Sequence, residues 1–357
     1  MQDAQPREIR TEPRPDCYLC GQPGRELHKE LEDRLVGVPG RWALRVCPAA
    51  DCGLIWLDPF PVAADIGLAY EGRYYTHETA TAPVSWFRRA YDAVKQGSLR
   101  VRMGYTRGVG PSWYRLLAPI AHLVPGATTA VDASAMFQRA PGAAGAARVL
   151  DVGCGSGELL ARMRDLGWSV EGVDFDPRAV EAARSRGLTV RRGDLHTHHY
   201  PDATFDVVHL RHVIEHVFDP VGVLAECRRI LKPGGRLVLI TPNSSSWGHA
   251  HFDRDWYALD PPRHLHLFHV SNLRTAARRA GFVKVVTRAM CHEARTVLAL
   301  SAMYRTYGLP WNRIEHRYNL SWSIRGVLYQ AWEHLLSFRR PESGEEALCL
   351  AWKDQAA

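Results

Sequence analysis

The fold of this chain is decided by one stretch, Val149-Leu150-Asp151-Val152-Gly153-Cys154-Gly155-Ser156-Gly157-Glu158-Leu159-Leu160. An apolar run typical of a buried strand leads into three alternating glycines and then into a segment with helical character. Glycines in such a turn let the backbone bend sharply and approach a ligand closely. The helix that follows offers unpaired N–H groups and the positive end of its dipole to an anion. The stretch therefore predicts a loop that binds a nucleotide-like ligand.

The spacing of the glycines narrows the class of ligand. A dinucleotide-binding loop of the form G-x-G-x-x-G needs glycine at position 158, which Glu158 occupies, and this argues against NAD. A glycine-rich turn after a strand is nevertheless common in α/β domains. Taken alone, the stretch leaves several nucleotide-binding folds open.

Composition sets the outer limits. A chain of 357 residues can hold one large α/β domain with additions, and its 46% hydrophobic and 23% charged residues are typical of a soluble globular protein. We find no apolar run long enough to span a bilayer and no signal-peptide core after Met1, so we expect a cytoplasmic protein. The net charge of +7 is compatible with an anionic substrate, a membrane surface or nucleic acid, and selects none of them.

Four cysteines near the N-terminus form two pairs. Cys17 and Cys20 have the spacing C-x2-C, and Cys47 and Cys52 have the spacing C-x4-C. In a reducing compartment such pairs indicate a tetrahedral zinc site better than disulfides, since the other four cysteines of the chain are scattered. Four thiolates leave no open position on the metal, so the predicted Zn²⁺ is structural. The alternative is four unrelated buried cysteines.

The remainder of the chain predicts a doubly wound parallel sheet, because strands and helices alternate. Asp176-Pro177 and Asp219-Pro220 are each typical of a helix N-cap followed by proline in the first turn, and we expect Ser271 to cap a further helix. The expected strands are Arg148–Val152, Trp168–Asp174, Leu188–Arg192, Phe205–Leu210, Arg236–Thr241, Phe282–Met290 and a final edge strand at Glu345–Lys353.

The expected organisation is a disordered tail (1–15), a zinc knuckle (16–62), a helical connector or lid (63–145, ending in the linker Ala140–Gly145), a cofactor-binding core (146–291), a helical insertion (292–342), and the last strand with a tail (343–357). Aromatic residues interleaved with arginine in the connector could grip nucleic acid or a membrane. Packed helices that expose arginine produce the same pattern, and we favour that interpretation.

Further positions match one known family together. Asp174 ends the second strand, where a carboxylate can accept hydrogen bonds from ribose hydroxyls. Asp194 and Leu195 follow the third strand, and Leu231-Lys232-Pro233-Gly234-Gly235 precedes the fifth. With the glycine loop, these motifs resemble the class I S-adenosylmethionine-dependent methyltransferases over about residues 148–290. The resemblance implies the strand order 3-2-1-4-5-7-6 and S-adenosylmethionine contacts from Asp151, Gly153, Cys154, Gly155, Gly157, Asp174, Phe175, Asp194, Leu195 and Arg211.

Two motifs are similar to a bacterial subgroup that often carries an N-terminal four-cysteine motif and lies in clusters for polysaccharides, lipids or secondary metabolites: residues 210–217 and 260–268, with Thr241-Pro242-Asn243 between them. The Glu215-His216 pair also resembles ubiquinone-biosynthesis O-methyltransferases, where two acids and a histidine hold a divalent metal. Here His212 replaces the first acid. His212, Glu215 and His216 also match the H-x-x-E-H motif of inverzincin proteases. Their position directly after the fourth strand argues against a protease.

Methyl transfer from a sulfonium needs an aligned nucleophile, exclusion of water and, for a hydroxyl or amine, a base. His216 is the first candidate base, with Glu215 and His212 beside it, because ligands bind at the carboxyl ends of strands in open sheets. His264 and His266 are the next candidates, and Arg263 could pair with an anionic substrate group. The alternatives are a supporting hydrogen-bonded loop at 212–216 and an ordinary strand at 264–268.

We therefore expect a cytoplasmic S-adenosylmethionine-dependent methyltransferase with a structural Zn²⁺, acting on O, N or C of a small-molecule, sugar-linked or lipid-linked acceptor. Helical segments at about 85–124 and 292–340 are expected to cover the acceptor pocket and offer a peripheral membrane contact. An RNA base methyltransferase is the first rival, disfavoured because the basic residues are dispersed. The second is an inactive binding module, against which the intact glycine loop and Asp174 argue. The oligomeric state stays open.

Overall fold

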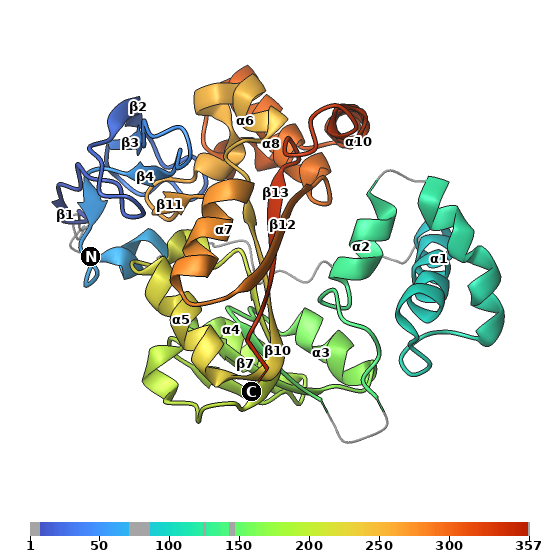
Figure 1. Ribbon diagram of the computed structural model, residues 1–357. Coiled ribbons are helices and arrows are strands. Elements are labelled where there is room, and N and C mark those ends of the chain that lie inside the picture. The colour runs from blue at the N-terminus through green and yellow to red at the C-terminus, as the bar shows by residue number, and fades with distance from the viewer. Residues whose placement is uncertain (1–7, 71–85, 124–125, 143–146, 356–357) are drawn as a thin grey trace, which may run out of the picture.

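The predicted glycine-loop strand lies in the middle of a seven-stranded sheet. The structure is a computed structural model that describes residues 8–70, 86–123, 126–142 and 147–355 (Figure 1). In spatial order the strands are β12 (Lys284–Met290), β13 (Glu346–Trp352), β10 (Leu231–Pro242), β9 (Phe205–Arg211), β6 (Arg148–Val152), β7 (Ser169–Asp174) and β8 (Val190–Arg192). Only β13 runs antiparallel to its neighbours in this sheet. The predicted order 3-2-1-4-5-7-6, and with it the α/β fold class, is confirmed.

Helices cover both faces of this sheet because consecutive strand residues point to opposite sides. Val149 packs with one face and Leu150 with the other. Helices α3 (Glu158–Asp165) and α4 (Pro177–Ser185) pack on one face, and α5 (Pro220–Ile230) and α7 (Val270–Arg279) pack on the other. Asp176 and Asp219 cap α4 and α5 as predicted. The predicted Ser271 cap is wrong, since the His269 side chain accepts the Ser271 N–H and serves as the N-cap of α7.

The N-terminal residues form a second sheet, which also includes one strand from the loop after β10. In order, its strands are β11 (His266–Leu267), β4 (Ile55–Leu57), β3 (Trp42–Val46) and β2 (Arg25–Leu31). Strand β11 lies in the long loop after β10 and pairs with β4 through His266 and Trp56. Trp56 is 2% exposed and belongs to the same apolar cluster as Leu150 of the central sheet. The cysteine-bearing segment therefore shares one continuous core with the rest of the chain.

The expected disordered tail is only partly outside the described residues. Residues 1–7 are not described, but β1 (Thr11–Glu12) pairs antiparallel with β5 (Phe60–Pro61), and Ile9 is buried. The expectation of disorder is therefore wrong for residues 8–15, which the backbone pairing holds against the N-terminal sheet. Residues 143–145 of the expected linker also lie outside the described part of the chain.

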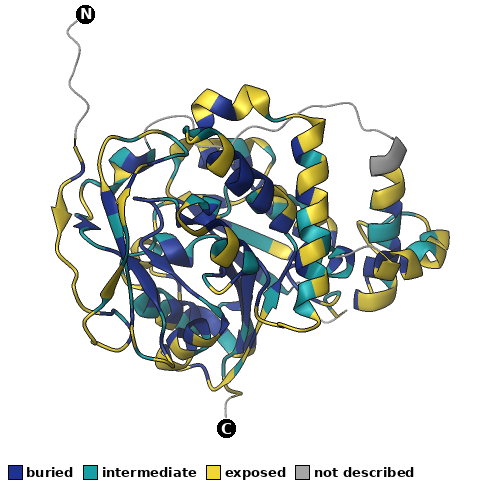
Figure 2. Cartoon of the chain, turned by 90° about the horizontal axis from the view of Figure 1, so that it is seen from above, coloured by how far each residue is buried: buried dark blue, intermediate teal, exposed yellow. Residues whose placement is uncertain are grey.

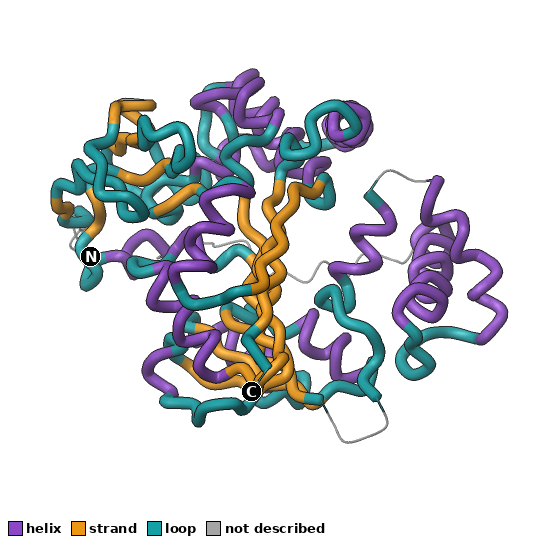
Figure 3. The backbone as a smooth tube through the Cα atoms, in the orientation of Figure 1, coloured by secondary structure: helices purple, strands orange, loops and turns teal. Residues whose placement is uncertain are grey.

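Two groups of helices flank the sheets. The first comprises α1 (Trp86–Met103), η3 (Ser112–Leu123) and α2 (Ala127–Ala133), and the second comprises α6 (Trp247–Phe252), α8 (Ala294–Tyr307), α9 (Trp311–Ile314) and α10 (Leu320–Ser337). Short 3₁₀ turns are η1 (Ile66–Tyr70), η4 (His196–His198), η5 (Ile214–His216), η6 (Asp253–Asp255), η7 (Tyr257–Leu259) and η8 (Glu315–Arg317). Buried residues concentrate around the sheet (Figure 2). The long strands on the β12–β13–β10 side of the sheet extend toward the second helical group (Figure 3). Among the described helices none is long and apolar enough to cross a membrane.

Candidate active site

The glycine loop joins β6 to α3 in a backbone conformation that excludes most other residues. Gly153 has φ +71°, and a Cβ added there would lie 2.4 Å from the Val213 side chain. Gly155 and Gly157 also have positive φ, and no heavy atom lies within 4 Å of a Cβ built at Gly155. Gly157 is the N-cap of α3 without a side-chain capping bond, so the first helical N–H groups remain for a ligand.

Asp174 lies beside this loop at the carboxyl end of β7. Its Oδ2 accepts the Gly155 N–H at 2.8 Å, and its Oδ1 accepts the Asp176 N–H at 2.9 Å. These bonds hold the carboxylate, which is 7% exposed, at the rim of the loop. The neighbouring Phe175 is 55% exposed, with its ring centroid 5.1 Å from that of Tyr70. The structure thus brings the predicted ribose acceptor to the predicted loop.

Asp151 and Cys154 support the loop from inside. Asp151 is 4% exposed, and its Oδ1 lies 2.7 Å from Nδ1 of His209, a buried partner on the neighbouring β9 that sequence reasoning missed. The Cys154 sulfur packs against Gly172, where an added Cβ would lie 2.7 Å from it. Burial raises the pKa of the Cys154 thiol well above its ordinary value, so the sulfur is a neutral thiol at neutral pH.

The other predicted cofactor residues lie at neighbouring strand ends. The Asp194 carboxylate accepts the Thr197 N–H at 2.8 Å, and Leu195 beside it is 2% exposed. Arg211, at the end of β9, pairs with Glu293 at 2.5 Å, just before α8 begins. Arg211 therefore links the central sheet to the helical insertion.

A cluster of imidazole and carboxylate groups follows β9. The nitrogen and oxygen ligand atoms of Glu215, His216 and His264 all lie within 4.8 Å of one another. Nδ1 of His216 lies 3.0 Å from the Arg263 carbonyl oxygen, and Nδ1 of His264 lies 2.7 Å from the Ala258 carbonyl oxygen. Because a carbonyl only accepts, each Nδ1 carries the proton and each Nε2 carries a lone pair. The structure therefore brings together two predicted histidines with available lone pairs.

Burial keeps His216 neutral. Burial and the neighbouring His264 lower the pKa of His216 to about 4, although Glu215 and Asp260 act in the opposite direction. Burial disfavours the charged form of Glu215, but His212 and His216 outweigh it and lower the pKa of Glu215 to about 2. The Thr241 hydroxyl donates to Glu215 Oε2 at 2.9 Å. A neutral imidazole thus lies beside a fixed, fully buried carboxylate.

His212 lies between two carboxylates. Its Nδ1 is 3.4 Å from Glu215 Oε1, and its Nε2 is 3.2 Å from Glu346 Oε1. The other Glu346 oxygen lies 3.6 Å from Nδ1 of His292. Burial opposes protonation of His212, but the two glutamates raise its pKa from 6.5 to about 9. His212 is therefore an imidazolium at neutral pH, suited to orienting Glu215 rather than to accepting a proton.

This arrangement predicts a stability difference at alkaline pH. Because the folded-state pKa of His212 is raised, its contribution is complete below pH 6.5 and is lost as the pH rises through about 9. We expect wild-type protein to lose more free energy of unfolding than His212→Gln between these two pH values, measured by urea denaturation with chelator present. Exposed His122→Gln is the control and should follow wild type. Equal losses in wild type and His212→Gln would contradict the assignment.

Two other predicted residues have structural surroundings. Arg263 was expected to reach an anionic substrate, but its side chain is 0% exposed and pairs with Asp33 and Asp260, so that expectation is wrong. The ring of His266 packs 5.3 Å from Tyr18 and 5.5 Å from Phe60, and burial lowers its pKa to about 3. The structure does not bring His266 to the His216–His264 cluster, because His264 lies in the turn before β11 whereas His266 is held in β11 by its pairing with Trp56.

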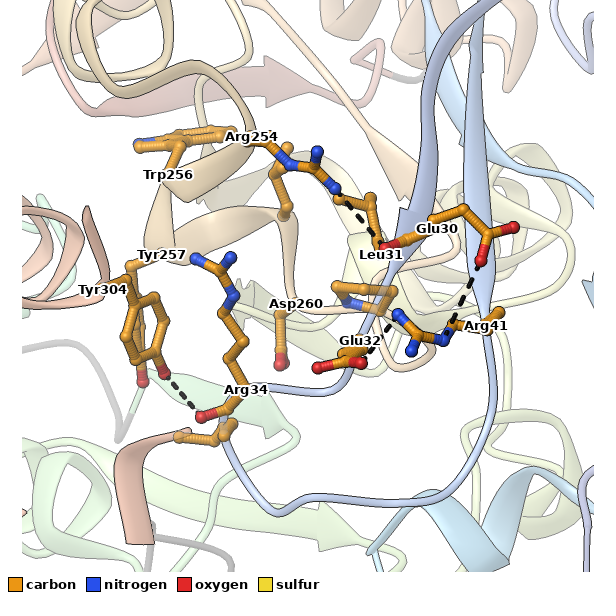
Figure 4. A pocket seen from close by; sticks show the side chains of 13 residues that line it. Glu30, Leu31, Glu32, Arg34, Arg41, Arg254, Trp256, Tyr257, Asp260 and Tyr304 are labelled. Carbon is orange, nitrogen blue, oxygen red and sulfur yellow. Dashed lines mark hydrogen bonds and ion pairs between the residues drawn. The ribbon is translucent and has the colours of Figure 1, made fainter. Parts of the chain in front are cut away.

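A pocket of about 190 Å³ opens between the N-terminal sheet and the loop after β10 (Figure 4). Its wall includes Asp260, the same residue that pairs with Arg263. Two arginines at the pocket already have carboxylate partners, Arg34 with Asp255 and Arg41 with Glu32. The lining residues are Glu30, Leu31, Glu32, Arg34, Leu35, Arg41, Arg254, Trp256, Tyr257, Leu259, Asp260, Pro261 and Tyr304. Arg254, which donates to the carbonyl oxygens of Lys29 and Glu30, is the arginine of this lining that pairs with no carboxylate among the described residues.

The four N-terminal cysteines meet as predicted. All four sulfurs lie within 4.8 Å of one another, with 3.6 Å between Cys17 and Cys52 and 3.3 Å between Cys20 and Cys47. These separations exceed a disulfide bond and are close to the roughly 3.8 Å sulfur–sulfur edge of a tetrahedral zinc thiolate site. The backbone amide of Leu19 points to the Cys17 sulfur. The donor set and the amide orientation fit Zn²⁺.

Comparison with known proteins agrees with the central domain. Residues 122–287 match a family model described as a methyltransferase domain. The ubiquinone biosynthesis O-methyltransferase of Xanthomonas oryzae pv. oryzae (strain PXO99A) is 41% identical over 104 residues, 27% of this chain and 44% of that protein. Its counterpart from Maricaulis maris is 36% identical over 147 residues, 38% of this chain and 58% of that protein. The chain thus matches about half the length of these relatives.

Among solved structures, an S-adenosylmethionine-dependent methyltransferase from Mesorhizobium loti aligns with a TM-score of 0.41 and 20% identity, over 63% of this chain and 97% of that one. The chain contains a class I S-adenosylmethionine-dependent methyltransferase domain, as the matched family model and the sheet order both show. A cluster of four cysteines and additional helices accompany that domain.

Proposed function

We propose that the protein transfers the methyl group of S-adenosylmethionine to a hydroxyl oxygen of a small-molecule acceptor, which can be sugar-linked or lipid-linked. The observation that carries the proposal is the His216–Glu215–His264 cluster after β9, which Tyr70 connects to the cofactor side: its hydroxyl lies 3.1 Å from Nδ1 of His216 and its ring centroid 5.1 Å from that of Phe175. The relatives named as O-methyltransferases support the choice of oxygen. Nitrogen and carbon acceptors remain outcomes that acceptor screening would reveal.

In the proposed reaction the acceptor oxygen forms a bond to the methyl carbon while the carbon–sulfur bond breaks and its electrons neutralise the sulfonium. The acceptor proton passes to Nε2 of His216, whose Nδ1–H is held by the Arg263 carbonyl. Although His216 is a weak base in the free protein, the acceptor proton becomes acidic as the new bond forms, and Glu215 stabilises the resulting imidazolium. His264 restricts the ring from the other side at a centroid distance of 4.7 Å.

Cofactor binding is tested by titration calorimetry. Wild-type protein should bind S-adenosylmethionine, and Asp174→Ala should weaken that binding at least about tenfold, because a charge-assisted hydrogen bond contributes about 1.5–3 kcal/mol. The substitution of the exposed Asp194 in Asp194→Ala separately tests the contact with the adenine of S-adenosylmethionine. His216→Ala serves as the control that should leave cofactor affinity unchanged. Binding of the cofactor to Asp174→Ala with wild-type affinity would refute the assignment of Asp174 to the ribose.

The base is tested by acceptor turnover. Once an acceptor is found, His216→Ala should lower kcat roughly a hundredfold or more, as removal of a general base does, with the affinity for S-adenosylmethionine retained. His122→Ala is the control, because His122 is exposed and lies outside the cluster. Full activity in His216→Ala would overturn the proposed base.

A second role for the same residues is a divalent-cation site. Glu215, His216 and His264 would hold the ion, and the buried Glu215 Oε1 makes no well-aligned hydrogen bond beyond its ion pair with His212 at 3.4 Å. Such an ion would polarise the acceptor oxygen and lower its pKa. The cationic His212 next to Glu215 opposes binding of an ion there. Repeating the turnover assay after chelation separates the two roles, since a base alone survives removal of metal.

Two rival functions are less well supported. An RNA base methyltransferase needs a basic surface, whereas several arginines of the N-terminal sheet are paired with acids, as Arg45 is with Asp58. An inactive binding module would not need the lone pairs of His216 and His264 to converge. We therefore place both below the small-molecule methyltransferase.

A further inference from the structure

Helix α10 exposes an apolar face that no described part of the chain covers. Leu320, Ile324, Leu328, Trp332 and Leu335 recur every three or four residues and are each 50–75% exposed. The opposite face packs on α8. Figure 1 shows α10 at the edge of the molecule, beyond α8. Soluble monomers rarely leave a continuous apolar stripe of this kind to water, so this face indicates an interaction surface.

A second element, η3, also exposes apolar side chains. The chain just after η3 approaches the middle of α10, because a Cβ built at Gly126 would lie 3.3 Å from Nε2 of Gln330. The same Gln330 Nε2 donates to the Cys291 carbonyl oxygen at 2.8 Å and so fixes α10 to the end of β12. Element η3 adds four apolar side chains that are 43–81% exposed: Trp113, Leu116, Ile120 and Leu123.

The charges that accompany these apolar residues have one sign. Within η3 the only lysine, arginine, aspartate or glutamate is Arg115, which is exposed. Between Glu315 and the buried Glu333 the only charged residues are Arg317 and Arg325, and both are exposed. The two apolar elements therefore present cationic groups to whatever binds them.

We propose that η3 and the outward face of α10 dock on an anionic phospholipid surface. The leucine, isoleucine and tryptophan side chains enter the headgroup region, and the arginines contact lipid phosphates. A second copy of this chain is a poorer occupant, since a two-fold interface would bring the same cationic elements face to face. Nucleic acid is also a poorer occupant, because leucine and isoleucine offer no ring on which bases stack. The proposal does not depend on the acceptor.

The test is cosedimentation of the full-length protein with vesicles. We expect binding to vesicles that contain about one third phosphatidylglycerol in phosphatidylcholine, and at least roughly tenfold weaker binding to phosphatidylcholine alone. Raising the salt concentration should weaken binding to the anionic vesicles. The double substitution Leu328→Ser with Trp332→Ser should weaken binding at least about tenfold. Val283→Ser is the matched control, because Val283 is 71% exposed and lies outside both elements.

Unchanged S-adenosylmethionine affinity and thermal midpoint in the double variant would show that it is folded. The proposal fails if wild-type protein does not bind anionic vesicles, or if the double variant binds them as wild type does. It also fails if analytical ultracentrifugation shows a dimer that the double variant dissociates, since the surface then belongs to a second copy. The proposal also fails if RNA displaces the vesicles and binds the wild-type and Val283→Ser proteins equally but does not bind the double variant. The surface would then bind nucleic acid.

Discussion

Cys17→Ser or Cys52→Ser should abolish zinc binding and unfold the N-terminal sheet. The binding free energy of a structural zinc in small domains is about 10–16 kcal/mol, and it exists only in the folded state. The sulfurs of Cys17 and Cys52 are buried and lie in the apolar cluster that also contains Trp56. We therefore expect zinc content to fall from one ion per chain to none and the thermal midpoint to fall sharply, measured by metal analysis and calorimetry.

The loss of folded structure after removal of a cysteine ligand should extend beyond the cysteine cluster. Strand β11 pairs with β4, and residues 260–268 around it carry His264. With β4 unfolded, methyl transfer should fall even while the glycine loop still binds S-adenosylmethionine. Cys227→Ala, at a buried thiol of α5 outside the four-cysteine cluster, is the control, and the protein that carries it should keep its zinc. Zinc content and stability that survive replacement of each cluster cysteine in turn would contradict a metal site.

Arg263→Ala should cost about 3–5 kcal/mol of unfolding free energy, because removing one partner of a buried ion pair leaves the other charge uncompensated. The guanidinium is 0% exposed, donates from Nη1 to Asp33 Oδ2 at 2.9 Å and to the Ala69 carbonyl oxygen at 3.0 Å, and also pairs with Asp260. It thus ties the N-terminal segment to the loop that holds His216. Urea denaturation at neutral pH measures the effect.

The matched control is Arg254→Ala, an exposed arginine of the same loop region whose hydrogen bonds go only to the carbonyl oxygens of Lys29 and Glu30. It should change the unfolding free energy by no more than about 0.5 kcal/mol. A similarly small change in unfolding free energy for Arg263→Ala would mean that Asp33 and Asp260 become hydrated or protonated without the arginine. It would contradict a structural role for the buried ion pair.

The parts of the molecule that the sequence predicted are those encoded locally. The turn at Gly153–Gly157 and the Asp176 cap depend on residues that are neighbours in the chain, so their conformations follow from short-range sterics and hydrogen bonds. The cysteine cluster was predictable because thiolate pairs at fixed spacings have few other uses. The strand boundaries differ by a few residues, for instance at β10, which already begins at Leu231 rather than at Arg236.

The residues that were missed come from distant parts of the chain. Asp33 meets Arg263 across 230 positions, and Tyr70 meets His216 across 146, distances at which no spacing rule operates. Glu346 carried a weak signal, since an acid next to Glu345 at the start of an apolar strand is costly unless paired. Its partners, His212 and His292, become apparent only when β13 is placed beside β10.

The position of β13 has a consequence for how the chain is made. Residues 346–352 insert between β10 and β12, which are both complete by residue 290. While the ribosome synthesises the intervening helices, β10 and β12 lack the strand that pairs with both of them. Unpaired strand edges can form hydrogen bonds with other chains. We therefore expect the nascent protein to depend on chaperones until its last strand emerges, and truncation before residue 346 to yield aggregates.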